Sequence, residues 1–223
     1  MTAGGPRAAV FDVDGTLVDS TYLHAVTWWE AFRQAGHRVQ MAAIHRSVGM
    51  GADHLIDHLL GPDRNEPDQD EAISTAHTAL YAQYWTRLAP LNGAADLLRA
   101  CAARGWRVVL ASSATGPELD AMRKALDAED AITTVTSADD VRSSKPSPDL
   151  VQQALEQSGA APQDAVFVGD TVWDMRAGGR AHVPCIGVLS GGFCRSELLD
   201  AGAQEVYADA GELRAHLDTS PLR

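Results

Sequence analysis

Two pairs of carboxylates each follow a short apolar run in the sequence. Asp12 and Asp14 come after AAVF, and Asp170 and Asp174 come after AVFVG. One carboxylate can attack a phosphoryl group, and a second carboxyl can protonate the departing oxygen. Carboxylates that share a pocket repel one another unless a cation binds, and a small set of oxygen ligands suits Mg²⁺. The residue types therefore predict a Mg²⁺ site with a nucleophilic carboxylate.

Hydroxyls and a lysine follow two further apolar runs. Ser112 and Ser113 end VVLASS, and Lys145 lies in SSKPSPD. A hydroxyl and an ammonium can neutralise the oxygens of a transferring phosphoryl group. The chain has 16 Arg but only two Lys, so Lys124 is the one other candidate for a compact ammonium. Ser113 can equally cap the helix that follows, and Lys145 can be a solvated loop residue.

The apolar runs alternate with helical patterns along most of the chain. This order predicts an α/β fold with a doubly wound parallel sheet, buried on both faces because its strands are short and apolar. The carboxyl ends of parallel strands lie at one edge of a sheet, where ligands bind, so the polar groups above should meet there. The predicted strands cover residues 8–11, 107–111, 132–136, 165–168, 185–188 and, more weakly, 205–207.

A helical stretch without a convincing strand interrupts this alternation after the first strand. Helical patterns cover residues 22–35, 52–60 and 70–87, the first with Asp19 or Ser20 as N-cap. We expect residues 1–18 and 90–223 to form the core domain and residues 19–89 to form an inserted all-helical cap. An insert of roughly 70 residues is at the lower end of domain sizes. It should lie over the edge of the sheet that carries the polar groups.

Three residues of this insert are candidates for substrate binding. Arg46 and Gly49 lie in IHRSVGMGAD, where a flexible turn could bring a guanidinium onto an anionic substrate. His24 shares a helix face with Trp28, which is also the spacing of ordinary core or hinge packing. An Arg on a solvated helix end is an equally good interpretation of Arg46.

Four motifs in order, DVDGTLVDS, LASSA, SKPSPD and VGDTVWD, resemble those of the haloacid dehalogenase superfamily. The insert resembles the C1 cap of its phosphoglycolate phosphatase and beta-phosphoglucomutase group. The resemblance spans nearly the whole chain and implies a Rossmann-like core. It also implies that Asp12 is the nucleophile and Asp14 the acid/base, and that Ser112 and Lys145 hold the phosphate.

The resemblance further implies a ligand set for Mg²⁺. The side chains of Asp12 and Asp170 and the backbone carbonyl of Asp14 would bind the ion. Asp174 would support metal-bound water or Lys145. The implied activity is a Mg²⁺-dependent phosphatase that acts on a small phosphorylated metabolite through an aspartyl-phosphate.

Three other functions use parts of the same inventory. A sugar phosphomutase of the beta-phosphoglucomutase type shares the cap and motifs, although the cap here contains no lysine. A haloacid dehalogenase needs neither Asp14 as an acid nor the metal, so Asp14 and Asp170 disfavour it. An inactive binding module would not need the full catalytic set. Rapid release of phosphate separates a phosphatase from a mutase.

The composition limits the partners and the location. A net charge of −12 and a pI of about 4.9 disfavour binding to nucleic acid or acidic membranes. No apolar run reaches the length of a membrane span, and the N-terminus lacks secretory and transit patterns. Three cysteines without CxxC spacing do not suggest disulfides or zinc. We expect a cytoplasmic monomer, because one chain supplies the whole catalytic set.

Overall fold

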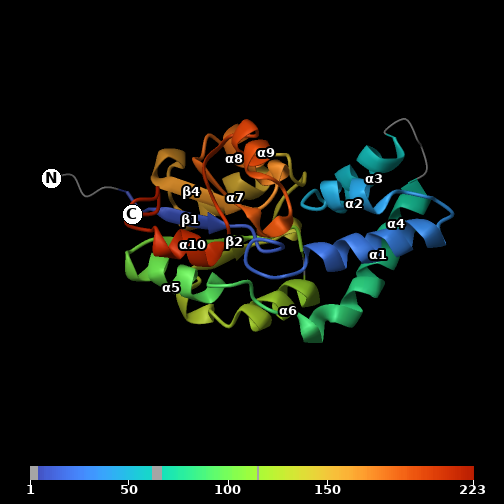
Figure 1. Ribbon diagram of the computed structural model, residues 1–223, viewed down its shortest axis with the longest axis horizontal. Coiled ribbons are helices and arrows are strands. Elements are labelled where there is room, and N and C mark those ends of the chain that lie inside the picture. The colour runs from blue at the N-terminus through green and yellow to red at the C-terminus, as the bar shows by residue number, and fades with distance from the viewer. Residues whose placement is uncertain (1–4, 62–66, 115) are drawn as a thin grey trace.

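A six-stranded parallel sheet forms the centre of the molecule (Figure 1). The computed structural model describes residues 5–61, 67–114 and 116–223. The strand order is β3-β2-β1-β4-β5-β6, so β1 lies between β2 and β4. This is the predicted doubly wound arrangement, and the fold class is confirmed. The strands are β1 (Ala8–Phe11), β2 (Arg107–Ala111), β3 (Thr134–Thr136), β4 (Ala165–Gly169), β5 (Cys185–Val188) and β6 (Ala203–Tyr207).

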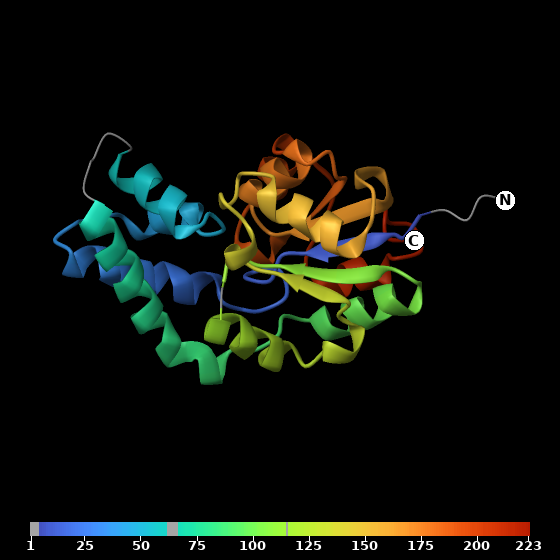
Figure 2. The ribbon, with the colours of Figure 1, turned by 180° about the vertical axis from the view of Figure 1, so that it is seen from behind.

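Both faces of the sheet are buried, because alternate residues of each strand enter different apolar clusters. Phe11 and Leu110 belong to one cluster, whereas Val10 and Val109 belong to the other. Helices α5, α6 and α10 supply the first cluster, and α7, α8 and α9 supply the second; the two groups lie on opposite sides of the sheet (Figure 2). These helices are α5 (Ala94–Ala103), α6 (Gly116–Leu126), α7 (Asp149–Ser158), α8 (Val172–Arg180), α9 (Arg195–Asp200) and α10 (Ala210–Ala215).

The insert between β1 and α5 is helical throughout its described part and stands beyond one end of the sheet (Figure 1). It has its own apolar cluster, which includes Trp28, Phe32 and Ile44. Its elements are α1 (Thr21–Gln34), α2 (Met41–Ser47), α3 (Ala52–Leu60), α4 (Pro67–Tyr81) and the 3-10 helix η1 (Ala82–Arg87). None of the helices in the described ranges is long and apolar enough to cross a membrane.

The chain enters and leaves the insert at neighbouring positions. The Asp19 amide donates to the Ala89 carbonyl at 3.0 Å, and the Leu91 amide donates to the Leu17 carbonyl at 2.8 Å. Val18 and Pro90 form an isolated antiparallel bridge between these contacts. The two crossings are therefore held side by side, at the positions where the sequence predicts the limits of the cap.

Element boundaries depart from the prediction where local patterns are weak. Residues 41–47 form the short helix α2, although the sequence suggested a flexible turn in IHRSVGMGAD, which begins at Ile44. The difference arises because Ile44 packs against the other insert helices. The predicted helix over 70–87 begins at Pro67 and changes to a 3-10 helix after Tyr81. Ser20 is the N-cap of α1 by position, but its hydroxyl makes no capping bond. Short helices such as α9 and α10 carried no periodic signal.

We predict that Phe167→Ala lowers the free energy of unfolding by about 3–5 kcal/mol, since it leaves a cavity beside β4. Urea titration followed by circular dichroism measures the change. Val26→Ala on the exposed side of α1, where the side chain is 41% exposed, should change the same quantity by less than about 0.5 kcal/mol. Equal effects of the two substitutions would contradict the placement of Phe167 in the core.

Candidate active site

The predicted site residues gather at the carboxyl edge of the sheet because their strands are neighbours. Asp12 follows β1, and its amide donates to the Val168 carbonyl of β4 at 2.9 Å. Asp170 follows β4, and Ser112 follows β2 on the other side of β1. Lys145 lies on the loop after β3. Residues more than 130 positions apart are thus brought into one place by strand order alone.

The Lys145 ammonium joins two of these carboxylates. Its Nζ lies 2.5 Å from Asp12 Oδ1 and 2.8 Å from Asp174 Oδ1, and all three side chains are buried. Burial alone would lower the pKa of Lys145, but Asp12 and Asp174 raise it above its ordinary value. Burial raises the pKa of Asp12 to about 7, against the opposing effect of Lys145. Lys145 therefore stays protonated beside the Asp12 side chain.

Asp170 completes a cluster of three buried carboxylates. Asp12, Asp170 and Asp174 each offer an oxygen, and these oxygens lie within 4.8 Å of one another. Asp170 Oδ1 accepts a hydrogen bond from Thr16 Oγ1 at 2.9 Å, whereas Oδ2 is buried without a partner in the described part of the chain. Burial and the charges of Asp174 and Asp12 raise the pKa of Asp170 well above its usual range. An unsatisfied oxygen among crowded carboxylates is what a divalent ion would relieve, so the donor set fits Mg²⁺.

Asp174 has both oxygens engaged by protein groups. Oδ1 accepts from Lys145, and Oδ2 accepts from the Thr171 amide at 3.0 Å and the Thr171 hydroxyl at 2.6 Å. The Thr171 hydroxyl in turn accepts from the Asp174 amide, which makes a capping box at the start of α8. This geometry suits a residue that orients Lys145.

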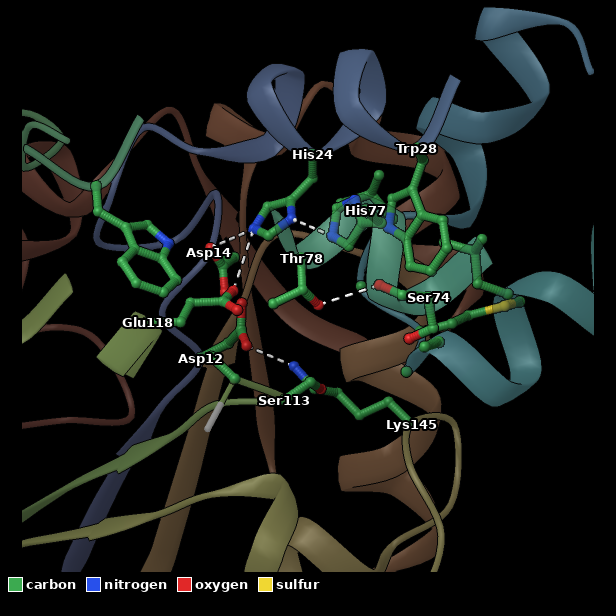
Figure 3. Close-up of a pocket in the computed structure, with 18 of the residues that line it drawn as sticks. Asp12, Asp14, His24, Trp28, Ser74, His77, Thr78, Ser113, Glu118 and Lys145 are labelled. Atoms are coloured by element: carbon green, nitrogen blue, oxygen red, sulfur yellow. Dashed lines mark hydrogen bonds and ion pairs between the residues drawn. The ribbon is translucent and has the colours of Figure 1, made fainter. Parts of the chain in front are cut away.

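Asp14 is paired with the insert rather than with the carboxylate cluster. Its Oδ1 lies 3.0 Å from His24 Nε2 and accepts a hydrogen bond from the Ser20 hydroxyl at 2.5 Å (Figure 3). Burial would raise the pKa of Asp14, but His24 and Ser20 lower it below its ordinary value. Burial would lower the pKa of His24, and Asp14 reverses this, so the net shift is upward. The carboxylate and imidazole thus hold one proton between them.

A second histidine supports the first. His77 Nε2 lies 3.3 Å from His24 Nδ1, and His77 Nδ1 lies 3.0 Å from the Thr27 hydroxyl. Burial and the nearby His24 lower the pKa of His77 well below its usual value, so His77 is neutral. Trp28 stacks on the His77 ring at 4.0 Å between centroids. The Nε2 atom of neutral His77 can accept a hydrogen bond from the Nδ1–H group of His24. This contact orients the His24 ring so that its Nε2 faces Asp14.

The two serines after β2 differ in their surroundings. Ser112 is fully buried, and its hydroxyl oxygen accepts a hydrogen bond from the Ala114 amide at 3.0 Å. Its own proton remains available to an incoming acceptor. Ser113 lines the cavity between core and insert, together with Asp12, Asp14 and Lys145.

This cavity has a volume of about 270 Å³, and both parts of the molecule line it (Figure 3). His24 and Gly49, two of the residues that the sequence suggested for substrate binding, line the cavity from the insert. Gly49 has φ +100°, and a Cβ there would meet Thr171 Cγ2 at 2.8 Å, so this backbone conformation and close contact favour glycine.

Arg46 lies outside the described lining of the cavity. Its guanidinium pairs with Glu197 of α9 and lies over the Phe193 ring, with Cζ 3.8 Å from the centroid. The Arg46 carbonyl also accepts a hydrogen bond from Trp173 Nε1 at 3.0 Å. In this geometry an acid and an aromatic ring of the core engage the Arg46 side chain, and its contact with substrate stays a prediction.

Sequence reasoning missed three residues of the site: Thr16, His77 and Glu118. Thr16 lies in the first motif, DVDGTLVDS, so its position beside the site could be predicted. Its hydrogen bond to Asp170 could not, because Asp170 is 154 positions away. His77 falls at the buried spacing of α4 with Ile73 and Tyr81, and no pattern separates it from core residues. Glu118 is in the first turn of α6, and only the fold shows that this turn faces the cavity.

Comparison with known proteins places this geometry in a family. Residues 6–182 match the model of the haloacid dehalogenase-like hydrolases. A phosphoglycolate phosphatase of Rhodospirillum rubrum is 31% identical over 224 residues, covering 93% of this chain and 89% of that protein. The crystal structure of a hydrolase from Pseudomonas syringae superposes with a TM-score of 0.89 at 32% identity, covering 95% of this chain and 98% of that one.

A Bacteroides vulgatus protein described as a beta-phosphoglucomutase has a TM-score of 0.86 at 21% identity, covering 96% of this chain and 88% of that one. At that identity the likeness concerns the fold alone. The family model spans most of the chain, and the Rhodospirillum relative covers nearly all of it. The chain therefore belongs to the haloacid dehalogenase-like hydrolase family, and it is a phosphatase, a phosphoric monoester hydrolase.

Proposed function

We propose that this protein hydrolyses a small phosphorylated metabolite through an aspartyl-phosphate on Asp12, with Mg²⁺ as cofactor. The observation that carries the proposal is the Asp12 carboxylate itself. It lines the cavity, is held by Lys145 at 2.5 Å, and belongs to the three-carboxylate cluster. A buried acid beside a fixed cation and a cation-binding cluster is an arrangement suited to attack on a phosphoryl group.

In the first step an Asp12 oxygen forms a bond to phosphorus while the bond from phosphorus to the ester oxygen breaks. The leaving oxygen takes the proton that Asp14 and His24 hold between them at 3.0 Å. In the second step water attacks the acyl-phosphate and gives its proton to Asp14. Phosphate departs and the Asp12 carboxylate is restored. Lys145 and the hydroxyls of Ser112 and Ser113 neutralise the phosphoryl oxygens in both steps.

The residues that would hold Mg²⁺ are the side chains of Asp12 and Asp170 and the backbone carbonyl of Asp14, with Asp174 orienting Lys145. When bound, the ion supplies charge neutralisation that allows an anionic substrate to approach several carboxylates. Thr16 fixes the Asp170 carboxylate in the orientation required for this set.

A phosphatase fits the cavity better than a phosphomutase does. A sugar phosphomutase must hold a second phosphate while the first is transferred. Among the described residues that line the cavity, Lys145 is the only lysine or arginine, and it already faces Asp12. The name of the Rhodospirillum relative makes phosphoglycolate the first compound to assay.

We predict that Asp12→Asn lowers kcat by at least about a thousandfold without unfolding the protein, since an amide cannot act as the nucleophile. Phosphate release from a panel of monoesters measures activity, and circular dichroism monitors the fold. Asp19→Asn, an exposed acid of the same motif, serves as the matched control and should keep near-parent activity. A folded Asp12→Asn variant with most of its activity would exclude the mechanism.

We predict that EDTA abolishes activity and that added Mg²⁺ restores it. Thr16→Val should raise the Mg²⁺ concentration for half-maximal activity by about 10–100-fold, because Asp170 loses the hydroxyl that orients it. Isothermal titration of Mg²⁺ into the folded variant gives a second readout. Thr219→Val, at an exposed position near the C-terminus, is the control. Full activity in EDTA would argue against a metal-dependent reaction.

We predict that Lys145→Met lowers the free energy of unfolding by about 3–5 kcal/mol in metal-free buffer, because Asp12 and Asp174 lose their buried cation. The loss should be larger at about pH 8 than at about pH 5, since the raised pKa values of Asp12 and Asp170 let them take up protons as the pH falls. Lys124→Met on the surface of α6 is the matched control. An unchanged stability of Lys145→Met at both pH values would contradict the ion-pair assignment.

A further inference from the structure

Apart from the aspartates and Lys145, the lining of the cavity has a distinctive chemistry. Among its described residues it presents apolar, hydroxyl and imidazole groups and one acid, Glu118, but no lysine or arginine. The wall residues are Trp28, Val48, Met50, Leu55, Ser74, His77, Thr78, Trp85 and Glu118. The single ammonium of the cavity, Lys145, lies on the side of Asp12.

We infer that the preferred substrate is the monophosphate of an uncharged, hydroxyl-bearing alcohol, and that Glu118 disfavours leaving groups with a second anionic group. This inference rests on the proposed phosphatase function and narrows its substrate class. A carboxylate or second phosphate on the leaving group would lie near the Glu118 carboxyl with no described guanidinium or further ammonium to meet it, which is unfavourable.

Glu118 is the residue that makes the wall negative. Its side chain is only 17% exposed, and Oε1 lies 3.9 Å from His24 Nε2 (Figure 3). The His24 proton is already shared with Asp14 at 3.0 Å, so the charge of Glu118 is only partly balanced. Burial raises its pKa to about 7, with His24 opposing and Asp14 reinforcing that rise. Whether ionised or neutral, the Glu118 carbonyl oxygen can accept a hydrogen bond from a substrate hydroxyl.

Arg46 is the cation that the sequence suggested for an anionic substrate, and its position supports the inference. Glu197 and Phe193 of the core engage its guanidinium from two directions. Moving it into the cavity would leave Glu197 without this partner and would remove the cation-π contact. The arginine is therefore used to join insert and core.

The same wall offers groups suited to an uncharged alcohol. Trp85 contributes its indole ring to the lining, and its buried Nε1–H has no hydrogen-bond partner in the described part of the chain. Ser74 and Thr78 add hydroxyls from α4, while Met50 and Leu55 add apolar surface. A donor, an acceptor and apolar area match the hydroxyls and carbons of a small alcohol.

The test compares 2-phosphoglycolate with 2-hydroxyethyl phosphate, which differ by a carboxylate in place of a hydroxymethyl group. With Mg²⁺ present, we expect kcat/KM for 2-hydroxyethyl phosphate to exceed that for 2-phosphoglycolate by at least about tenfold. Equal values, or a preference for 2-phosphoglycolate, would overturn the inference while leaving the phosphatase function intact. If neither ester nor p-nitrophenyl phosphate released phosphate, the proposed function itself would be wrong.

Two variants assign the effect to Glu118. Glu118→Gln keeps the shape of the side chain and removes its charge, so the ratio of the two kcat/KM values should shift toward 2-phosphoglycolate by about threefold or more. Asp120→Asn removes an exposed acid two positions along the same helix and should leave the ratio unchanged. If the ratio of the two kcat/KM values shifted equally in both variants, or shifted in neither, Glu118 would be excluded as the selective residue.

Discussion

The buried ion pairs of Lys145 with Asp12 and Asp174 are the constraint on which the site depends. Removing three charged groups from water is costly, and only close mutual contact and further hydrogen bonds compensate for it. The compact ammonium of Lys145 contacts two carboxylates through one nitrogen atom. A planar guanidinium would have to use several nitrogen atoms in a flat fork to make the same two contacts. The same contacts tie the loop after β3 to the end of β1 and to α8, so Lys145 joins the elements that carry the acids.

The insert has a chemical role as well as a covering one. Asp14 belongs to the core, but its imidazole partner His24 comes from α1 and the histidine behind it comes from α4. The insert therefore supplies the imidazole that lowers the pKa of Asp14. The two chain segments that join insert and core are hydrogen-bonded to each other around Val18 and Pro90. These bonds help to hold His24 of the insert beside Asp14 of the core.

Charge is distributed unevenly over the cavity. Among the described residues that line it, Lys145 is the one lysine or arginine, and it lies against Asp12, whereas Glu118 adds an acid elsewhere in the lining. The phosphate end and the alcohol end of a substrate thus meet different environments. The chain shares its family with relatives named for phosphoglycolate, and Glu118 and Trp85, which line the cavity, lie outside the four sequence motifs.

The amino-acid sequence by itself determined the α/β class, the six strands and the presence of a helical insert, because short apolar runs and helical periodicity are local signals. It also identified Asp12, Asp14, Lys145 and Asp170 as groups that strand order would collect, and the structure brings them to one edge. Their catalytic roles remain predictions. Only the tertiary structure decided that Arg46 joins Glu197, that His77 supports His24, and that Glu118 faces the cavity. The contacts of Arg46 with Glu197 and of His24 with His77 link residues 151 and 53 positions apart, and such pairings depend on how helices pack rather than on any local pattern.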